Sequence, residues 1–398
     1  MIAQHRIGAP QPLAQHVAQM LAAYQGAMAA SAALGTESFP WHPSLDPSGL
    51  EPPDPVVLAQ EVGARMATTL AGLARWQNHP YRRAPETAPP VWQSGATRLL
   101  DHAPDAPHTA VAVLVLPSLV NRAYIMDLTP ETSAMGRLAA AGLHPYLLDW
   151  GAPGPDEAGF GIQHYVARAR AALAHIGPAC LLGYCMGGTV AAGLAARNSE
   201  NIRGLVALGA PWDFTAGGGV RSQLRLLYGQ HDGAAARALL GGLAETYGCI
   251  PAALFQSLFA ALTPLAFATK FRRFAELPAY SPAETCFVAL EDWLADGIAM
   301  SAPAAQELLL DWHLGNAPQL GNWQLEGGPV RAQNLTCPTL VVAGSHDTIA
   351  PAAGALALAR AAPKATAFTA GTGHVGLITS ARAAPVLWQR VCSFVQSL

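Results

Sequence analysis

The chain of 398 residues has few charged side chains, and this scarcity excludes several classes of protein. Charged residues make up 12% of the sequence and the formal net charge is −3, whereas 51% of the residues are hydrophobic. A chain without an excess of basic residues has no electrostatic basis for binding nucleic acid or an anionic membrane. The apolar content instead predicts a large buried core, with exposed apolar surface for a partner or an apolar substrate.

The sequence also lacks long apolar runs and closely spaced cysteines. No uninterrupted stretch of about 18 apolar residues occurs, so we expect no membrane span. Residues 13–34 resemble a signal peptide, but His16, Gln19 and Gln25 interrupt the apolar region. The 6 cysteines form no CxxC pair, which argues against a zinc site or a disulfide framework. We therefore expect a cytoplasmic protein without a bound metal.

Residues 1–95 differ in pattern from the rest of the chain. Apolar residues recur at helical spacing over residues 13–34 and again over 57–77. Between them, residues 39–57 are too rich in proline for a regular element and are typical of a linker. We predict an N-terminal helical segment joined to the remainder of the protein by a Pro-rich connection.

Residues 96–211 and 329–398 alternate short apolar strands with helical patterns, which is typical of a mostly parallel sheet with helices on both faces. The expected strands are Val111–Leu116, Pro145–Asp149, Cys180–Tyr184, Ile202–Leu208, Thr339–Ala343 and Ala365–Thr369. Residues 212–328 interrupt this alternation and read as helical and aromatic. We expect them to form a cap that covers the active site, excludes water and shapes a substrate channel.

The stretch "ACLLGYCMGGTV", residues 179–190, carries the strongest chemical signal. A short apolar strand leads through a Gly-flanked turn into an apolar helical pattern, which is the sequence of a nucleophile elbow. Cys185 occupies the position of the nucleophile, where serine is usual. The alternative is a small buried hydrophobic cysteine, but the GxCxGG pattern between strand and helix favours a nucleophile.

A nucleophile at an elbow needs a base and an acid that orients the base. In hydrolase-like sheets these follow in the order nucleophile, acid, histidine, and Asp347 and His374 both follow late strands in that order. Asp347 could instead cap the next helix, and His374 could be a solvated loop histidine. Asp213, after the strand that follows the elbow, is the alternative acid, and His346 is expected to be structural or to support the acid.

An oxyanion formed at Cys185 needs two backbone donors. One is the N–H of Met186, directly after the nucleophile, and the other belongs to the loop after the strand Val111–Leu116. Pro117 in that loop has no N–H, so the donor lies further along, and Val120 is the predicted residue.

Five segments together resemble the polyhydroxyalkanoate synthase family, the cytoplasmic polyester polymerases that carry cysteine in a lipase-like box. They are "GYCMGG" at the elbow, "PSLVNRAYIMDLTPETS" (117–133), "DWGAPGPDEAGFGIQHYV" (149–166), "LEDWLADG" (290–297) and "GNWQLEGGPVRAQNLTCP" (321–338). The resemblance covers most of residues 90–378 and is strongest to the shorter synthases that pair with a second subunit. It implies an α/β-hydrolase-type fold.

The resemblance implies roles for the residues already singled out. The family's catalytic Cys, Asp and His fall on Cys185, Asp347 and His374, and its second oxyanion amide falls on Val120. A thiol is suited to this reaction because a helix N-terminus and a histidine favour the thiolate. Attack on an acyl-CoA then exchanges one thioester for another, and a hydroxyl accepts the acyl group to form a polyester.

Other functions remain open. Thr348 follows the acid where synthases usually have histidine, and "VGLITSARAAPVLW" after His374 is nearer to hydrolases and intracellular depolymerases. A cysteine-nucleophile hydrolase, either a polyester depolymerase or a thioesterase, is therefore the alternative. An inactive protein that binds polyester granules is a third possibility, favoured by the apolar surface and the N-terminal segment.

The remaining expectations concern ligands and partners. Acyl-CoA is expected as a substrate, with no cofactor. Lys270, Arg272 and Arg273 form the densest basic cluster of the cap and are candidates for binding the CoA phosphates, although a solvated helix face is the simpler explanation. We expect assembly as a homodimer or with a helical partner subunit, and association with polyester granules.

Overall fold

The computed structural model describes residues 12–33, 54–197, 200–228 and 233–398. Their contacts divide the chain into two compact units. The first comprises residues up to Arg82 together with Thr263–Glu291, and the second comprises Arg83–Leu262 and Asp292–Leu398. This division differs from the four expected segments, because part of the segment expected as a cap packs with the N-terminal helices. The expected linker, residues 39–57, lies almost wholly outside the described residues.

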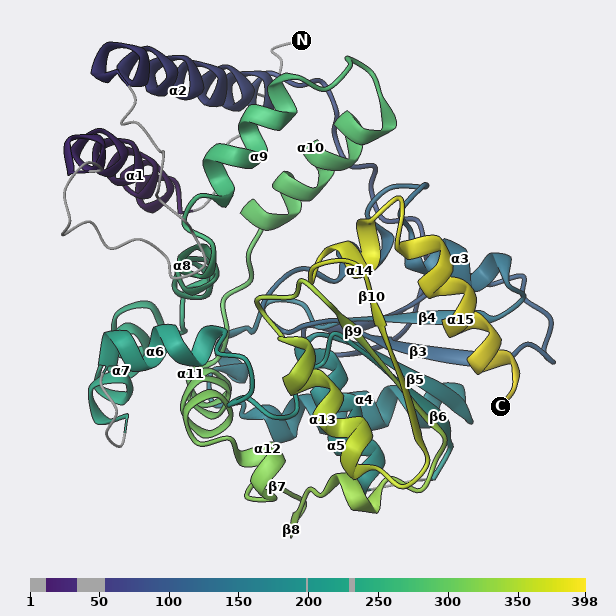
Figure 1. Cartoon of the computed structure of the whole chain (residues 1–398). Coiled ribbons are helices and arrows are strands. Elements are labelled where there is room, and N and C mark those ends of the chain that lie inside the picture. The colour runs from purple at the N-terminus through teal and green to yellow at the C-terminus, as the bar shows by residue number, and fades with distance from the viewer. Residues whose placement is uncertain (1–11, 34–53, 198–199, 229–232) are drawn as a thin grey trace. The chain divides into compact units, whose positions relative to one another are not determined.

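The second unit is built on an 8-stranded sheet with the order β1-β2-β4-β3-β5-β6-β9-β10 (Figure 1). All neighbouring strands from β4 to β10 pair in parallel, whereas β1 and β2 are antiparallel to their neighbours. The strands are β1 Pro90–Ser94, β2 Thr97–Asp101, β3 Ala112–Leu116, β4 His144–Asp149, β5 Ala179–Tyr184, β6 Ile202–Leu208, β9 Thr339–Gly344 and β10 Ala365–Ala370.

The predicted strands are confirmed as β3, β4, β5, β6, β9 and β10, with ends that differ by at most one residue. Runs such as β5, in which every residue is buried, are typical of central parallel strands covered on both faces. The hairpin β1–β2 was not predicted. It turns at Gly95, whose φ of +56° lies in the left-handed region that favours glycine.

Helices cover both faces of this sheet. α3 and α15 lie on one side, and α4, α5 and α13 lie on the other (Figure 1). Their bounds, with those of the short α14, are α3 Ala134–Ala140, α4 Ile162–Ile176, α5 Met186–Arg197, α13 Ala352–Ala361, α14 Gly376–Thr379 and α15 Ala384–Gln396. This arrangement is the expected three-layer α/β fold.

The chain between β6 and β9 is helical, as expected for the insertion. Within the second unit it forms α6 Val220–Tyr228, α7 Ala234–Tyr247, α8 Ala252–Leu262, α11 Ala302–Gln306, a π-helix at Glu307–Leu314, α12 Ala317–Leu320 and the short strands β7 Gln324–Leu325 and β8 Gly328–Pro329. Short 3-10 helices occur at Ala123–Asp127, Pro155–Glu157 and Ala332–Asn334. A π-helix of this length is unusual, and such elements are frequent at functional sites.

The first unit packs the N-terminal helices against part of the insertion. It contains α1 Leu13–Ala33, α2 Pro55–Gln77, α9 Ala266–Ala275 and most of α10 Pro282–Ala295. Its core consists of Trp76, Phe267, Phe271, Phe274 and Val288. The expected helices over residues 13–34 and 57–77 are thus confirmed, and both bury residues against α9, which lies about two hundred positions further along the chain.

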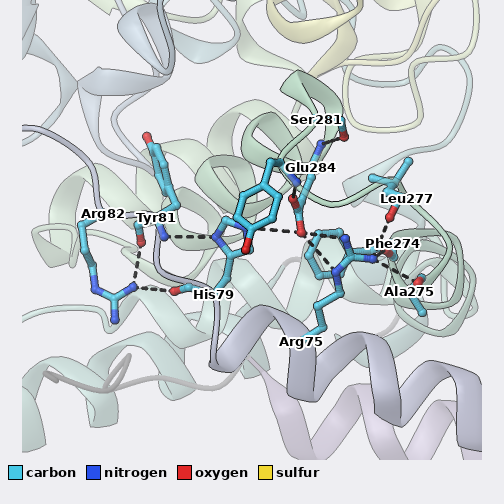
Figure 2. Close-up of polar contacts among 10 residues, drawn as sticks. Arg75, His79, Tyr81, Arg82, Phe274, Ala275, Leu277, Ser281 and Glu284 are labelled. Carbon is cyan, nitrogen blue, oxygen red and sulfur yellow. Dashed lines mark hydrogen bonds and ion pairs between the residues drawn. The ribbon is translucent and has the colours of Figure 1, made fainter.

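Arg75 of α2 forms an ion pair and hydrogen bonds with residues at the end of α9, in the following loop and in α10 (Figure 2). Its guanidinium contacts the Glu284 carboxylate at 2.7 Å, and 4% of the Glu284 side chain is exposed. Its Nη1 also donates to backbone carbonyls at 3.0, 3.1 and 2.8 Å, those of Phe274, Ala275 and Leu277. One side chain therefore supplies donors to carbonyls at the end of α9 and just beyond it.

None of the described helices is by itself long and apolar enough to cross a membrane. α8 and α9 pass the same length and composition test only when they are taken together as a bent pair.

Candidate active site

Cys185 sits at the sharp turn between β5 and α5. Its φ of +56° is a strained value for a residue with a side chain. Its backbone N–H donates to the carbonyl of Leu208 at 2.9 Å, and its carbonyl accepts from Gly188 at 2.9 Å, so the surrounding backbone fixes the turn. The structure therefore has the strand, turn and helix expected of a nucleophile elbow.

The glycines around Cys185 are required by close backbone contacts. A Cβ on Gly183 would lie 2.3 Å from Cα of Gly188, where the turn folds back on the strand. A Cβ on Gly187 would lie 2.1 Å from the carbonyl oxygen of Leu116, at the end of β3. The start of α5 is thus pressed against the loop that was expected to supply an oxyanion donor.

Asp347 and His374 form a buried pair. Asp347 Oδ2 contacts His374 Nδ1 at 2.6 Å, and the exposed fractions of the two side chains are 0% and 7%. Asp347 Oδ1 accepts from the N–H groups of Ile349 and Ala350 at 2.9 and 2.8 Å. The carboxylate is therefore held rigidly and orients the ring, leaving Nε2 buried and without a hydrogen-bond partner among the described residues.

The environment of His374 favours its protonated form. Burial alone would lower the pKa of His374, but the negative charges of Cys185 and Asp347 and the hydrogen bond that His374 donates to Asp347 raise it to about 10. Cys185 is therefore near enough to the ring for its charge to act there. Tyr184 stacks on the imidazole with ring centroids 5.1 Å apart and restricts its tilt. The arrangement suits a thiolate and imidazolium pair.

The alternative acid, Asp213, has other partners. Its Oδ1 accepts from the N–H and the hydroxyl of Thr215 at 2.9 and 2.6 Å, and from the Asn316 amide at 3.0 Å. These bonds lower the pKa of Asp213 against the opposing effect of burial. His346 bonds to Ser345 at 3.0 Å. Of the two carboxylates, the structure brings Asp347 to His374 and ties Asp213 to the loop after β6.

The two expected oxyanion donors, Met186 and Val120, line one cavity with Cys185. No hydrogen bond from the Met186 N–H is found within the described part of the chain. The Val120 N–H donates to the hydroxyl of Ser118 at 3.2 Å, a contact that was not predicted. In the reaction, an oxyanion would replace the Ser118 hydroxyl as the acceptor of the hydrogen bond from the Val120 N–H. Both roles remain predictions.

The cavity beside Cys185 is strongly apolar. It lies within the second unit and is lined from the loop after β3, the elbow, the loop after β6, α6, α8, the π-helix and the loop after β9. The lining residues are Ser118, Val120, Cys185, Met186, Pro211, Phe214, Val220, Phe255, Leu258, Phe259, Leu308, Leu309, His313, Ile349 and Ala350. An apolar pocket with few polar groups is typical of a site for a hydrophobic ligand.

The basic cluster expected to bind CoA phosphates lies on α9, in the first unit. Lys270 forms an ion pair with Glu291 at 2.7 Å, and 2% of the Glu291 side chain is exposed. Lys270 is therefore matched by a carboxylate of its own unit. Arg272 is half-buried and Arg273 is exposed. Phosphate binding by these residues remains a prediction.

One group of residues has the composition of a cation site. Ligand atoms of Glu86, His102 and Asp127 lie within 4.8 Å of one another. The Glu86 carboxylate already accepts from two backbone N–H groups and from Arg83 at 3.4 Å, and these contacts lower its pKa against the effect of burial. Internal donors therefore balance much of the negative charge. The sequence did not suggest this group because its members are widely spaced.

The sheet, the elbow and the Asp347–His374 pair define the class of the protein. A sequence model of the alpha/beta hydrolase fold family matches residues 138–381, which is more than half of the chain. The chain belongs to the alpha/beta hydrolase fold family. The predicted fold class is confirmed.

Curated relatives narrow this class. The poly(3-hydroxyalkanoate) polymerase subunit PhaC of Haloferax mediterranei is 30% identical over 296 residues, covering 71% of this chain and 58% of that protein. The subunit of the same name from Haloarcula marismortui is 29% identical over 306 residues, covering 73% and 62%. That from Allochromatium vinosum is 26% identical over 283 residues, covering 69% and 77%. The resemblance seen in the motifs is confirmed, and the chain spans 58% and 62% of the length of the first two relatives.

Proposed function

We propose that this protein is an acyltransferase that polymerises hydroxyacyl-CoA into a polyhydroxyalkanoate polyester through a thioester on Cys185. The observation that carries the proposal is a cysteine at a strained elbow, beside the Asp347–His374 pair and open to an apolar cavity. The names of the relatives support the same reaction.

In the first half of the reaction, the Cys185 thiolate attacks the thioester carbonyl of the acyl-CoA. The bond from the acyl carbon to the CoA sulfur breaks, and the departing sulfur takes the proton that His374 Nε2 holds. The N–H groups of Met186 and Val120 stabilise the oxyanion of the intermediate. The product is an acyl thioester on Cys185 and free CoA.

In the second half, His374 acts as a general base on the hydroxyl of a second hydroxyacyl chain. The hydroxyl oxygen attacks the acyl carbon, its proton passes to His374 Nε2, and the bond from the acyl carbon to Cys185 breaks. An ester forms and the thiolate returns. The apolar lining from α8 and the π-helix favours a hydroxyl on an apolar chain over water at this step.

The test is incubation of the full chain with 3-hydroxybutyryl-CoA while CoA, free 3-hydroxybutyrate and polymer are measured. We expect CoA release together with polymer. CoA release with equal amounts of free hydroxyacid would establish the alternative, a cysteine hydrolase. The absence of turnover with candidate partners present would leave a granule-binding protein.

We further propose that the protein works on granules in the cytoplasm as part of an assembly, either a homodimer or a complex with a helical partner subunit. The relatives are named as subunits, which supports an assembly. α1 exposes Leu21 and Met28 although it contacts α2 and α9. Such an incomplete apolar stripe is suited to a second chain.

A chain that begins at residue 54 retains α2 and tests the role of α1. We expect it to lose oligomeric mass in light scattering, measured with and without acyl-CoA. An unchanged mass together with unchanged specific activity would contradict a role for α1 in assembly.

A further inference from the structure

The cavity beside Cys185 contains one polar residue whose presence the proposed reaction does not explain. Its polar lining residues are Ser118, Cys185 and His313. Cys185 is the proposed nucleophile, and the Ser118 hydroxyl accepts from the Val120 N–H. His313 belongs to the π-helix, and among the described residues no hydrogen bond or ring contact joins it to the Asp347–His374 pair. Its ring packs against Phe214.

The tautomer of His313 follows from a single hydrogen bond. Its Nδ1 lies 2.8 Å from the carbonyl oxygen of Leu308. A carbonyl oxygen only accepts, so Nδ1 carries the proton and donates, and Nε2 carries a lone pair. Burial lowers the pKa of His313 to about 4 against the opposing effect of this bond, so the ring is neutral at pH 7.

The ring is also fixed in orientation. It packs edge-on against Phe214, with ring centroids 4.8 Å apart and an interplanar angle of 67°. Within the described ranges, no residue donates a hydrogen bond to Nε2. The ring therefore brings one oriented acceptor to a cavity whose other polar lining residues are Ser118 and Cys185, and an acceptor left unpaired in such surroundings costs free energy.

We propose that His313 recognises the hydroxyl group of the acyl chain that Cys185 carries. The hydroxyl donates to Nε2, while the apolar walls contact the alkyl part of the chain. This inference rests on the proposed function, and it adds the residue that selects hydroxyacyl over unsubstituted acyl thioesters. Sites that bind a substrate hydroxyl discriminate strongly against analogues without it, because the protein group is then left unpaired.

The π-helix explains why His313 can serve this role. Its wider turn brings the bond from Nδ1 back to Leu308, 5 residues earlier, within the same element. Leu308 and Leu309 of that element also line the cavity. The π-helix thus supplies both the apolar wall and the oriented acceptor.

The test compares 3-hydroxybutyryl-CoA with butyryl-CoA in the acylation of Cys185, followed by CoA release and by the mass of the intact protein. We expect the wild type to prefer the hydroxyacyl thioester in kcat/KM. His313→Asn places an amide whose Nδ2 can still donate to the Leu308 carbonyl, as His Nδ1 does, but it removes the acceptor at Nε2. We expect this variant to lose about 10-fold to 100-fold with the hydroxyacyl thioester and far less with butyryl-CoA.

Two further variants separate recognition from structure. His313→Gln restores a polar atom near the position of Nε2 and should recover part of the preference. His175→Asn, on an exposed position of α4, is the matched control and should alter neither rate. Melting temperatures establish that each variant is folded.

The outcomes of the test are distinguishable. If His313→Asn keeps the wild-type preference, or if the wild type has none, the proposal for His313 is wrong while the proposed function stands. If the wild type is acylated by neither thioester, the proposed function itself fails.

Discussion

The two units of the molecule each bury a carboxylate against a basic side chain, but they use the pair differently. In the first unit, 4% of the Glu284 side chain is exposed, and it meets Arg75. In the second unit, 0% of the Asp347 side chain is exposed, and it meets His374. Arg75 is permanently charged, whereas His374 titrates.

The two pairs differ in whether the basic side chain keeps a nitrogen without a hydrogen-bond partner. Arg75 uses its donors on Glu284 and on three backbone carbonyls, so the pair closes the end of a helix. His374 uses Nδ1 on Asp347 and keeps Nε2 without a hydrogen-bond partner among the described residues, in the neighbourhood of Cys185. A saturated pair stabilises a fold, whereas a pair with one open nitrogen can move a proton.

The largest expected effect follows from removing the nucleophile. Cys185→Ala should abolish acyl transfer, because no other group replaces the thiolate, whereas Cys249→Ala should keep activity within about twofold. CoA release from 3-hydroxybutyryl-CoA is the measurement. Iodoacetamide should inactivate the enzyme by labelling Cys185 first, and prior labelling of another cysteine would refute the assignment.

The second effect contrasts two aspartates of the same unit. Asp347→Asn should lower kcat by about 10³-fold to 10⁴-fold, because the amide cannot hold His374 in the required tautomer. Asp213→Asn should lower it by less than about tenfold, because that carboxylate holds Thr215 and Asn316 instead. Circular dichroism of both variants controls for folding, and the reverse ranking would move the acid to Asp213.

The third effect concerns the saturated pair. Arg75→Met should destabilise the protein by up to about 3–5 kcal/mol, because among the residues that the structure describes the buried Glu284 carboxylate then keeps only the His79 ring, at 3.3 Å, and the Tyr280 N–H as partners. Denaturant unfolding measures the loss. The double variant Arg75→Met/Glu284→Gln should be more stable than Arg75→Met alone, and strict additivity of the two changes would show that the residues are not coupled.

The fourth effect is a titration. The pKa of His374 is raised to about 10, above the usual histidine value of 6.5, so the charged ring stabilises the fold below pH 6.5 and this contribution is lost as the pH rises toward 10. In Cys185→Ala the pKa should fall, because the largest favourable charge is removed. Imidazole NMR signals measure it, and an unchanged titration would separate Cys185 from His374.

The smallest expected effect is at acidic pH. Burial opposes the charge of Glu284, but bonds from Arg75 and from the Tyr280 N–H lower its pKa below 4.5. Its contribution to stability is therefore present above pH 4.5 and is lost as the pH falls through the lowered pKa. In Glu284→Gln, the free energy of unfolding should fall less steeply as the pH is lowered below 4.5. A fall as steep as that of the wild type would show that other carboxylates cause the acid destabilisation.

Much of the second unit could be predicted because its signals are local. Buried parallel strands appear as continuous apolar runs, and β6 was predicted with its observed bounds. The elbow pattern around Cys185 combines turn and helix signals within a few residues. The hairpin β1–β2 was missed because β1, with the sequence PVWQS, is mostly exposed and has no continuous apolar run.

What the sequence did not reveal depends on contacts between distant positions. Arg75 and Glu284 are 209 positions apart, and nothing near either residue indicates the other. Nothing in the sequence indicates that Lys270 forms an ion pair with Glu291, which is 21 positions away. His313 was overlooked among thirteen histidines because a π-helix has no periodic signature that separates it from an α-helix.

The close packing of α2 on α9 has a consequence for the newly made chain. At Gly72 the two backbones approach so closely that a Cβ would overlap the carbonyl oxygen of Phe271, and the first bond from Arg75 to the α9 end spans 199 positions. Since a ribosome adds about 5–20 residues per second, α2 waits roughly 10–40 s for its partner to be synthesised. Throughout that interval the residues that bury Trp76 have not been synthesised, so its side chain stays exposed. We therefore expect a chaperone to bind the nascent N-terminal segment until the insertion has been made.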